Sequence, residues 1–165
     1  MQSFDVINRK DFMAKLLKSD LFDTFEVKEV VAHVAFKMVL DGKRNKDYFE
    51  DINDAPLDTY SEFLTWGEIR KHVYELMMGK KLPTYFKIIL STNQEKTKQL
   101  SLDASTFYLN ITFKDNQMSC STGTAYKGFT LDKSADQIWD DRMKRFLLKY
   151  EFILSLFYFI KGDGN

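Results

Sequence analysis

The chain has 165 residues, of which 44% are hydrophobic and 15% aromatic, so it is long enough and apolar enough to bury one core. Its 24 basic side chains balance 24 acidic ones, which leaves no long-range field to gather nucleic acid or an anionic membrane. One cysteine and two histidines argue against a zinc site and an internal disulfide. We therefore expect a single cytoplasmic domain over residues 1–165, with no metal, no cofactor, and no nucleic-acid or membrane partner.

The first predicted element is a helix over residues 9–19. Asn8 is placed to cap its first turn, and Ile7 and Phe12 have the spacing of a hydrophobic staple. The apolar stripe of this helix consists of Phe12, Met13, Leu16 and Leu17.

A strand signal follows in residues 25–42, "FEVKEVVAHVAFKMVLDG", which are rich in β-branched side chains. The alternation changes phase near Lys28 and Glu29, as a bulge or turn would produce. Asp41 and Gly42 are expected to end a hairpin. Beyond the phase change one face is predicted to carry Val30, Ala32, Val34, Phe36, Met38 and Leu40.

A second helix is expected after Thr65, because Thr65 and Glu68 form a capping box, T-x-x-E. Residues 84–91, "TYFKIILS", then predict a strand. We interpret residues 43–64 and 92–104 as polar connections.

The strongest strand signal lies in residues 106–114, "TFYLNITFK", where apolar and polar side chains alternate strictly. Asp115 and Asn116 suit a two-residue turn, so the following residues are expected to return antiparallel. This pairing predicts that Met118 lies opposite Phe113, and that Cys120 lies opposite Ile111.

The last helix is expected to begin at Ala135, behind a second capping box formed by Ser134 and Gln137. From Trp139 its apolar residues recur at alternating steps of four and three, so the pattern could extend as far as Phe157. Runs of strands with hairpin turns, separated by helices, are typical of an α+β fold. We predict a mainly antiparallel sheet of about six or seven strands and three helices, the last of them C-terminal.

Residues 123–130, "GTAYKGFT", repeat the glycine spacing of a phosphate-binding loop, except that Phe129 replaces the lysine. Such a loop requires a strand that leads directly into a helix. Here "GFTL" is expected to continue as strand. We therefore predict no nucleotide site, and interpret Gly123 and Gly128 as brackets of a turn or bulge.

Other side chains with chemical potential are expected to be structural or solvated. Cys120 faces Ile111 in the predicted pairing and is expected to be buried and unreactive. His33 and His72 are interpreted as structural or solvated. Solvated faces are also the interpretation for the basic residues Lys43, Arg44, Lys46, Arg142, Lys144, Arg145 and Lys149.

The second face of the predicted sheet gathers hydrogen-bonding side chains from two neighbouring strands: Tyr108, Asn110, Ser119 and Ser121. They are either the wet side of an antiparallel sheet or a ligand-binding site. The sequence shows no nucleophile beside a base, no metal cluster and no cofactor fingerprint. The first hypothesis is therefore a non-enzymatic binding or protein-interaction module, and the alternative is an enzyme acting on a small polar ligand at this face.

Several sequence segments, in this order and spacing, are similar to those of one protein family: "KDFMAKLLKSDLFDTF", "LDGKRNKDYF", "YFKIIL", "LNITF", and "CSTGTAYKGFTLDK" followed by "WDDRMKRFL". Over residues 8–148 the chain resembles a family of small intracellular Firmicutes proteins of unknown function. The resemblance implies a bacterial cytosolic protein and gives no residue a role.

Residues 152–160, "FILSLFYFI", are too few to span a bilayer as a helix, which takes about twenty. They are expected either to continue the last helix or, after a break near Tyr150, to form a buried strand. An apolar surface left uncovered there would predict a homodimer through this segment, whereas the alternative is that the segment completes the monomer core.

Overall fold

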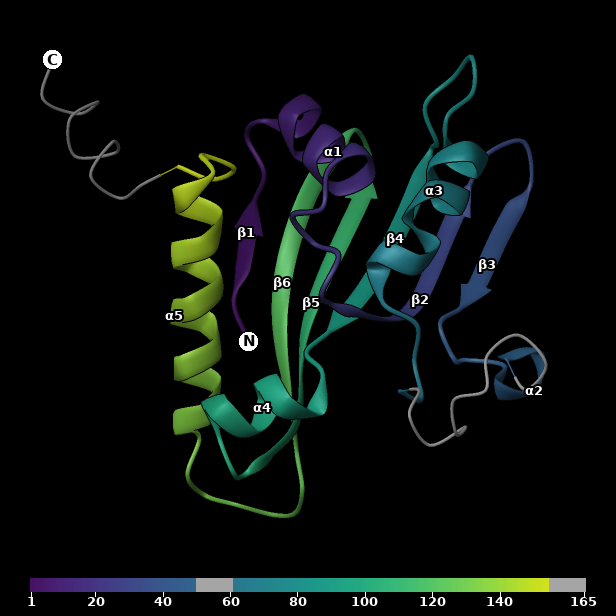
Figure 1. Cartoon of the computed structure of the whole chain (residues 1–165). Coiled ribbons are helices and arrows are strands. Elements are labelled where there is room, and N and C mark those ends of the chain that lie inside the picture. The colour runs from purple at the N-terminus through teal and green to yellow at the C-terminus, as the bar shows by residue number, and fades with distance from the viewer. Residues whose placement is uncertain (50–60, 155–165) are drawn as a thin grey trace, which may run out of the picture.

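One six-stranded antiparallel sheet organises the chain, and its strands run in the order β1-β6-β5-β4-β2-β3 (Figure 1). The computed structural model describes residues 1–49 and 61–154. The strands are β1 (Ser3–Asp5), β2 (Glu26–His33), β3 (Lys37–Asp41), β4 (Tyr85–Ser91), β5 (Ala104–Lys114) and β6 (Gln117–Tyr126). The helices are α1 (Arg9–Lys18), α2 (Lys46–Phe49), α3 (Trp66–Met77), α4 (Gln94–Leu100) and α5 (Ser134–Lys149).

The predicted α+β class, the antiparallel sheet and the C-terminal helix are confirmed. The described residues contain five helices rather than three, because α2 and α4 form where polar connections were predicted. α4 has the sequence QEKTKQL, which carries no apolar stripe. Its start is fixed locally instead, since the Asn93 side chain accepts a hydrogen bond from the Lys96 amide at 2.8 Å.

The β5–β6 hairpin is the part of the fold that the sequence predicts best. Asp115 and Asn116 have φ angles of 51° and 61°, the left-handed conformation that a two-residue turn of this kind requires. Phe113 pairs with Met118 and Ile111 with Cys120, as predicted. The alternation in β5 therefore divides the sheet into an apolar face and a polar face.

Strands β2 and β3 form a hairpin, whereas residues 30–40 were predicted to continue as one strand beyond the phase change. The turn at residues 34–36 closes with a hydrogen bond from the Val34 amide to the Phe36 carbonyl, at 3.0 Å. Val30 pairs with Leu40 and Ala32 with Met38, so these four residues share a face, whereas Val34 and Phe36 lie in the turn and Phe36 is exposed. The expected bulge is confirmed as a register shift between Val27 and Glu29.

The hairpin of β2 and β3 ends at Asp41, as predicted, and Gly42 beyond it approaches the β2 backbone closely. A Cβ atom at Gly42 would lie 1.8 Å from the carbonyl oxygen of Val27. The Gly42 amide donates to the Lys28 carbonyl at 3.0 Å, and the Gly42 carbonyl accepts from Leu64 at 2.8 Å. Only glycine fits this position without moving the strand.

The capping predictions have mixed outcomes. The box of Thr65 and Glu68 is present at the start of α3. The second box is wrong, because Ser134 is itself the first residue of α5 and its amide donates to the Asp132 carboxylate at 2.9 Å. The staple predicted for α1 does not form as expected, because Ile7 is exposed. Asn8 occupies the predicted cap position of α1, but its side chain makes no capping hydrogen bond.

The segment "GTAYKGFT" does not form the predicted turn. Residues 123–126 belong to β6, and residues 127–133 connect that strand to α5. No glycine among the described residues has a positive φ, and Gly123 lies opposite Tyr108 in the strand pair. The interpretation of Gly123 and Gly128 as turn brackets is therefore wrong, as is the continuation of strand through "GFTL".

Helices α1, α3 and α5 supply the side chains that cover the apolar face (Figure 1). The indole of Trp66 in α3 donates to the carbonyl of Leu16 in α1 at 2.8 Å. The indole of Trp139 in α5 donates to the carbonyl of Tyr108 in β5 at 2.8 Å, and its ring stacks on Phe107 at 5.2 Å. These two tryptophans fix the helices to one another and to the sheet. None of the described helices is long and apolar enough to cross a membrane.

The sequence left open whether the last helix continues past Tyr150 or breaks there, and the structure shows the break. α5 ends at Lys149, and Glu151 has a φ of 58°. Phe152 then returns to the core, where its ring meets Phe12 at 4.9 Å and its carbonyl accepts from the Ile7 amide at 2.9 Å. Phe152 and Ile153 thus belong to the monomer core, and no strand forms over residues 151–154. The rest of the segment predicted as an interface lies outside the described residues.

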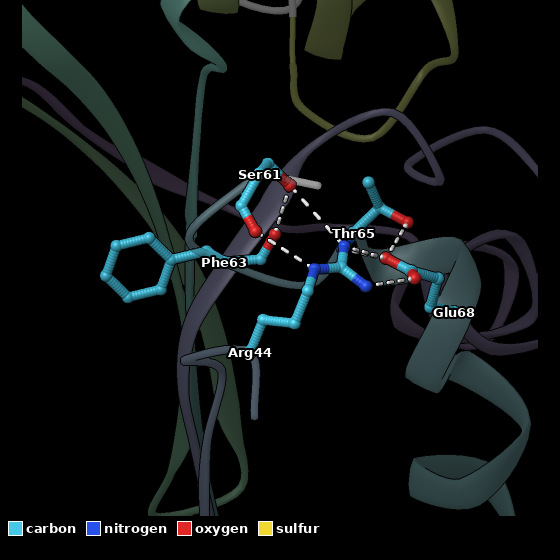
Figure 2. Close-up of polar contacts among 5 residues, drawn as sticks. All are labelled: Arg44, Ser61, Phe63, Thr65 and Glu68. Carbon is cyan, nitrogen blue, oxygen red and sulfur yellow. Dashed lines mark hydrogen bonds and ion pairs between the residues drawn. The ribbon is translucent and has the colours of Figure 1, made fainter. Parts of the chain in front are cut away.

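Arg44 was expected on a solvated face but is buried, with only 7% of its surface exposed. Its guanidinium donates to both carboxylate oxygens of Glu68, at 2.8 and 2.9 Å, and to the Ser61 carbonyl at 2.9 Å (Figure 2). Partial burial alone would raise the pKa of Glu68, but hydrogen bonds from Arg44 and Thr65 hold that pKa below its ordinary value. The Arg44–Glu68 pair therefore joins residues 61–65 to the start of α3.

Replacing this buried cation should destabilise the fold. We expect Arg44→Met to lower the free energy of unfolding by about 2 kcal/mol, because Glu68 loses its charged hydrogen-bond donor. The exposed neighbour provides a control, since Lys43→Met should change it by less than about 0.5 kcal/mol. Urea denaturation of both variants measures the difference, and equal effects would contradict the assigned role of Arg44.

The same pair predicts a pH dependence. The pKa of Glu68 is lower in the folded state, so its stabilising contribution is complete above the ordinary glutamate pKa. That contribution is lost as the pH falls through the lowered folded value. The stability gap between the wild-type protein and Arg44→Met should therefore shrink in acid.

Candidate functional site

The four predicted ligand-binding residues lie together on the sheet face that α1, α3 and α5 leave uncovered. Asn110 pairs with Ser121, whereas Tyr108 pairs with Gly123 and Ser119 with Thr112. The Asn110 amide approaches the Ser121 hydroxyl at 3.4 Å, which is long for a hydrogen bond. All four side chains are half-buried. Their common face was predictable from alternation, and ligand binding there stays a prediction.

Two further contacts join polar side chains on this face. The Lys87 ammonium lies 3.9 Å from the Glu29 carboxylate, and the His33 ring lies 4.8 Å from the ring of Tyr85. Cys120 faces the opposite way, is fully buried, and burial raises the pKa of its thiol to about 12. A thiolate nucleophile is therefore not supplied by Cys120 at neutral pH. Among the described residues, no three His, Cys, Asp or Glu side chains could hold a metal ion.

A different feature has the form of a binding site: a groove of about 510 Å³ between α1 and α3, which lie on the same face of the sheet (Figure 1). We call it the α1–α3 groove. Its floor consists of the buried side chains of Phe86, Phe113 and Met118, at the ends of three adjacent strands. A volume of this size is within the range of ligand-binding clefts.

One wall of the groove is a complete face of α1. The lining positions recur at helical spacing, so they follow α1 from its first residue to its last: Arg9, Lys10, Met13, Ala14, Leu17 and Lys18. The opposite wall comes from the end of α3 and the segment after it: Tyr74, Met78, Leu82 and Pro83. Met78 is 46% exposed and Leu82 is 75% exposed, so this wall presents apolar surface to solvent.

The charge of the groove has one sign. Arg9, Lys10 and Lys18 line it, and none of its described lining residues is acidic. At one end the Arg9 guanidinium donates to the side-chain oxygen of Asn116 at 2.9 Å. At the other end the Lys18 ammonium lies 5.6 Å from the ring centre of Tyr74, and so bridges α1 and α3. The result is an apolar trough with cations along its rim.

Sequence reasoning missed this groove. Met13 and Leu17 were identified as part of an apolar stripe, but the sequence did not indicate that they line a groove. Leu82 was the other sequence feature that could have indicated the groove, since it is an apolar residue within the polar run "GKKLPT". A single apolar residue in a loop is too common to predict a site by itself.

Comparison with known proteins identifies a family but no activity. The model of a family described as a family of unknown function (DUF5721) matches residues 15–154. The resemblance to a family of unknown function that the sequence predicts is therefore confirmed. No curated protein and no solved structure matches the chain significantly.

The polar face makes a prediction about stability. Asn110→Ala should change the free energy of unfolding by less than about 0.5 kcal/mol, because the side chain is half-exposed and makes one long contact. Its neighbour Ile111 is fully buried, so Ile111→Ala should cost about 2–5 kcal/mol. Thermal or urea denaturation measures both. A large loss in Asn110→Ala would mean that this face is structural and not free to bind a ligand.

Proposed function

The chain belongs to this family of unknown function, and from the geometry of its groove we propose that it is a non-enzymatic protein-interaction module. The α1–α3 groove receives the apolar face of an amphipathic helix whose flanks are acidic. The single observation that carries this proposal is the combination of an apolar floor with a rim of three cations and no acid among the described lining residues.

The exposed apolar surface of the groove wall favours the binding of a partner. Met78 and Leu82 keep much of their surface in water, and covering such surface is favourable by about 25 cal/mol per Å². Three of the lining residues, Met13, Met78 and Met118, are methionines. Unbranched thioether side chains adapt their shape to different partners, and are common in grooves that bind helices.

The dimensions of the groove suit a helix. The lining face of α1 extends from Arg9 to Lys18, which is about 14 Å at the rise of an α-helix. A partner helix of about three turns lying alongside would present apolar residues at positions i, i+3, i+4 and i+7. The groove volume of about 510 Å³ accommodates their side chains.

The charge of the rim selects the flanks of that helix. Glutamate or aspartate beside the apolar stripe would meet Lys10 along α1, with Arg9 and Lys18 at the two ends. Complementary charges accelerate association and fix orientation, whereas basic flanks would be repelled. The proposal therefore commits to an acidic amphipathic partner.

The alternative is an enzyme acting on a small polar ligand at Tyr108, Asn110, Ser119 and Ser121. It has weaker support, because these side chains offer hydroxyl and amide groups without a general base among them. A homodimer through the C-terminal segment is a separate proposal. Since Phe152 and Ile153 are buried within one chain, such a contact would begin at Leu154, which is 50% exposed.

A synthetic peptide tests the proposed function. The probe is a fluorescein-labelled helix of about four turns, with leucines at i, i+3, i+4 and i+7 and glutamates on both flanks. We expect it to bind the full-length protein in fluorescence anisotropy, more weakly as salt rises. Met78→Asp and Leu82→Asp should each weaken binding at least about tenfold, because each places a charge against the leucines.

Two matched controls separate groove effects from general ones. Leu76→Asp changes an exposed residue of α3 that does not line the groove, and should leave binding unchanged. The double variant Lys10→Glu and Lys18→Glu should bind the acidic peptide about tenfold more weakly. It should instead favour a matched peptide whose flanks carry lysine. Lys15→Glu, on the same helix but outside the groove, should show neither effect. Equal binding of both peptides, or no binding of either, would overturn the proposal.

A further inference from the structure

A second cavity, of about 400 Å³, opens at a different place on the helical side of the sheet. It lies between α4, α5 and the segment that leads from α1 into β2 (Figure 1). We call it the α4–α5 cavity. It shares no lining residue with the α1–α3 groove, so its occupant is a separate question.

Aromatic side chains give this cavity a firm apolar wall. Trp139, Phe146 and Phe25 line it. Trp139 is held by its hydrogen bond to the Tyr108 carbonyl and by stacking on Phe107. Phe146 packs edge-on against Phe22, with ring centres 5.5 Å apart. Because the core holds these rings in place, the wall exists before any ligand arrives, and it suits a flat ring.

Two cations from different helices face the same cavity. Lys96 comes from α4 and Arg142 from α5, and both side chains are half-buried. Among residues 1–49 and 61–154, neither side chain has an ion-pair or hydrogen-bond partner. Arg142 was predicted to lie on a solvated face, and in the structure its side chain is half-buried. Glu95 is the acid among the described lining residues, and it is exposed.

The position of Lys96 is fixed by the way α4 begins. The Asn93 side chain accepts from the Lys96 amide at 2.8 Å. The Thr97 hydroxyl, one residue later, lies 2.7 Å from the hydroxyl of Thr92, which is almost fully buried. Lys96 therefore stands on an anchored turn, and it lines the same cavity as Arg142. Two partly desolvated cations near one cavity favour a bound oxyanion, which both can reach by charge-assisted hydrogen bonds.

We propose that the α4–α5 cavity binds a small organic anion in which a carboxylate or phosphate is attached to an aromatic ring. The ring lies against Trp139 and Phe146, and the oxyanion lies between Lys96 and Arg142. This site is independent of the helix-binding function proposed for the groove.

Calorimetric titration of the full-length protein tests the site with benzoate and phenyl phosphate as probes. We expect at least one of them to bind and to change the tryptophan fluorescence, because Trp139 lines the cavity. Arg142→Gln and Lys96→Gln should each weaken that probe about tenfold. Lys144→Gln and Lys98→Gln, on the same two helices but outside the lining, should change its affinity less than twofold.

An uncharged aromatic probe tests whether the anionic group is needed for binding, and an anion without a ring tests whether the aromatic ring is needed. Benzyl alcohol and inorganic phosphate should each bind at least about tenfold more weakly than the charged aromatic probe. The proposal is overturned if neither aromatic anion binds at about 10 mM, if both glutamine variants leave binding unchanged, or if inorganic phosphate binds as tightly as phenyl phosphate. Lys10→Glu, in the groove, should leave this binding intact.

Discussion

The strict alternation of β5 is the constraint on which the rest of the structure depends. Phe107, Leu109 and Ile111 are fully buried on one side of this strand, and Tyr108 and Asn110 are half-exposed on the other. Burying a side chain of this size is worth about 1.5–3 kcal/mol, so the apolar face must be covered. β5 pairs with β4 on one side and β6 on the other, and both neighbours adopt its division into two faces.

Both candidate sites result from the way helices cover that face. A helix is about 10 Å across, and side chains at its edges cannot fill every space above a twisted sheet. α1 and α3 meet through Trp66 and Leu16 but leave a groove over Phe86, Phe113 and Met118. α5 is fixed through Trp139, and a second cavity remains between it and α4. On the polar face of the sheet, no helix among the described residues provides such cover.

Local signals account for what the sequence predicted. The Asp115-Asn116 turn, the register of β5 and β6, and the Thr65–Glu68 box each depend on residues a few positions apart. The turn at residues 34–36 was missed because Val34, Ala35 and Phe36 are not residues that mark turns. α4 was missed because its stability comes from the Asn93 cap and the buried Thr97, not from an apolar stripe. The burial of Arg44 depends on Glu68, 24 residues away, which no local pattern specifies. The groove joins α1, the end of α3 and the β5–β6 turn, so its existence is a tertiary property that sequence periodicity does not contain.

Chemical-shift mapping by NMR tests most directly the proposal that a partner binds in the α1–α3 groove and not on the polar face of the sheet. A ¹⁵N-labelled protein titrated with the acidic amphipathic peptide should show its largest amide shifts at Met13, Ala14 and Leu17 on α1, and at Tyr74, Met78 and Leu82 on the opposite wall. The amides of Tyr108, Asn110, Ser119 and Ser121 should change little. Shifts concentrated on those four residues, with α1 unperturbed, would contradict the account.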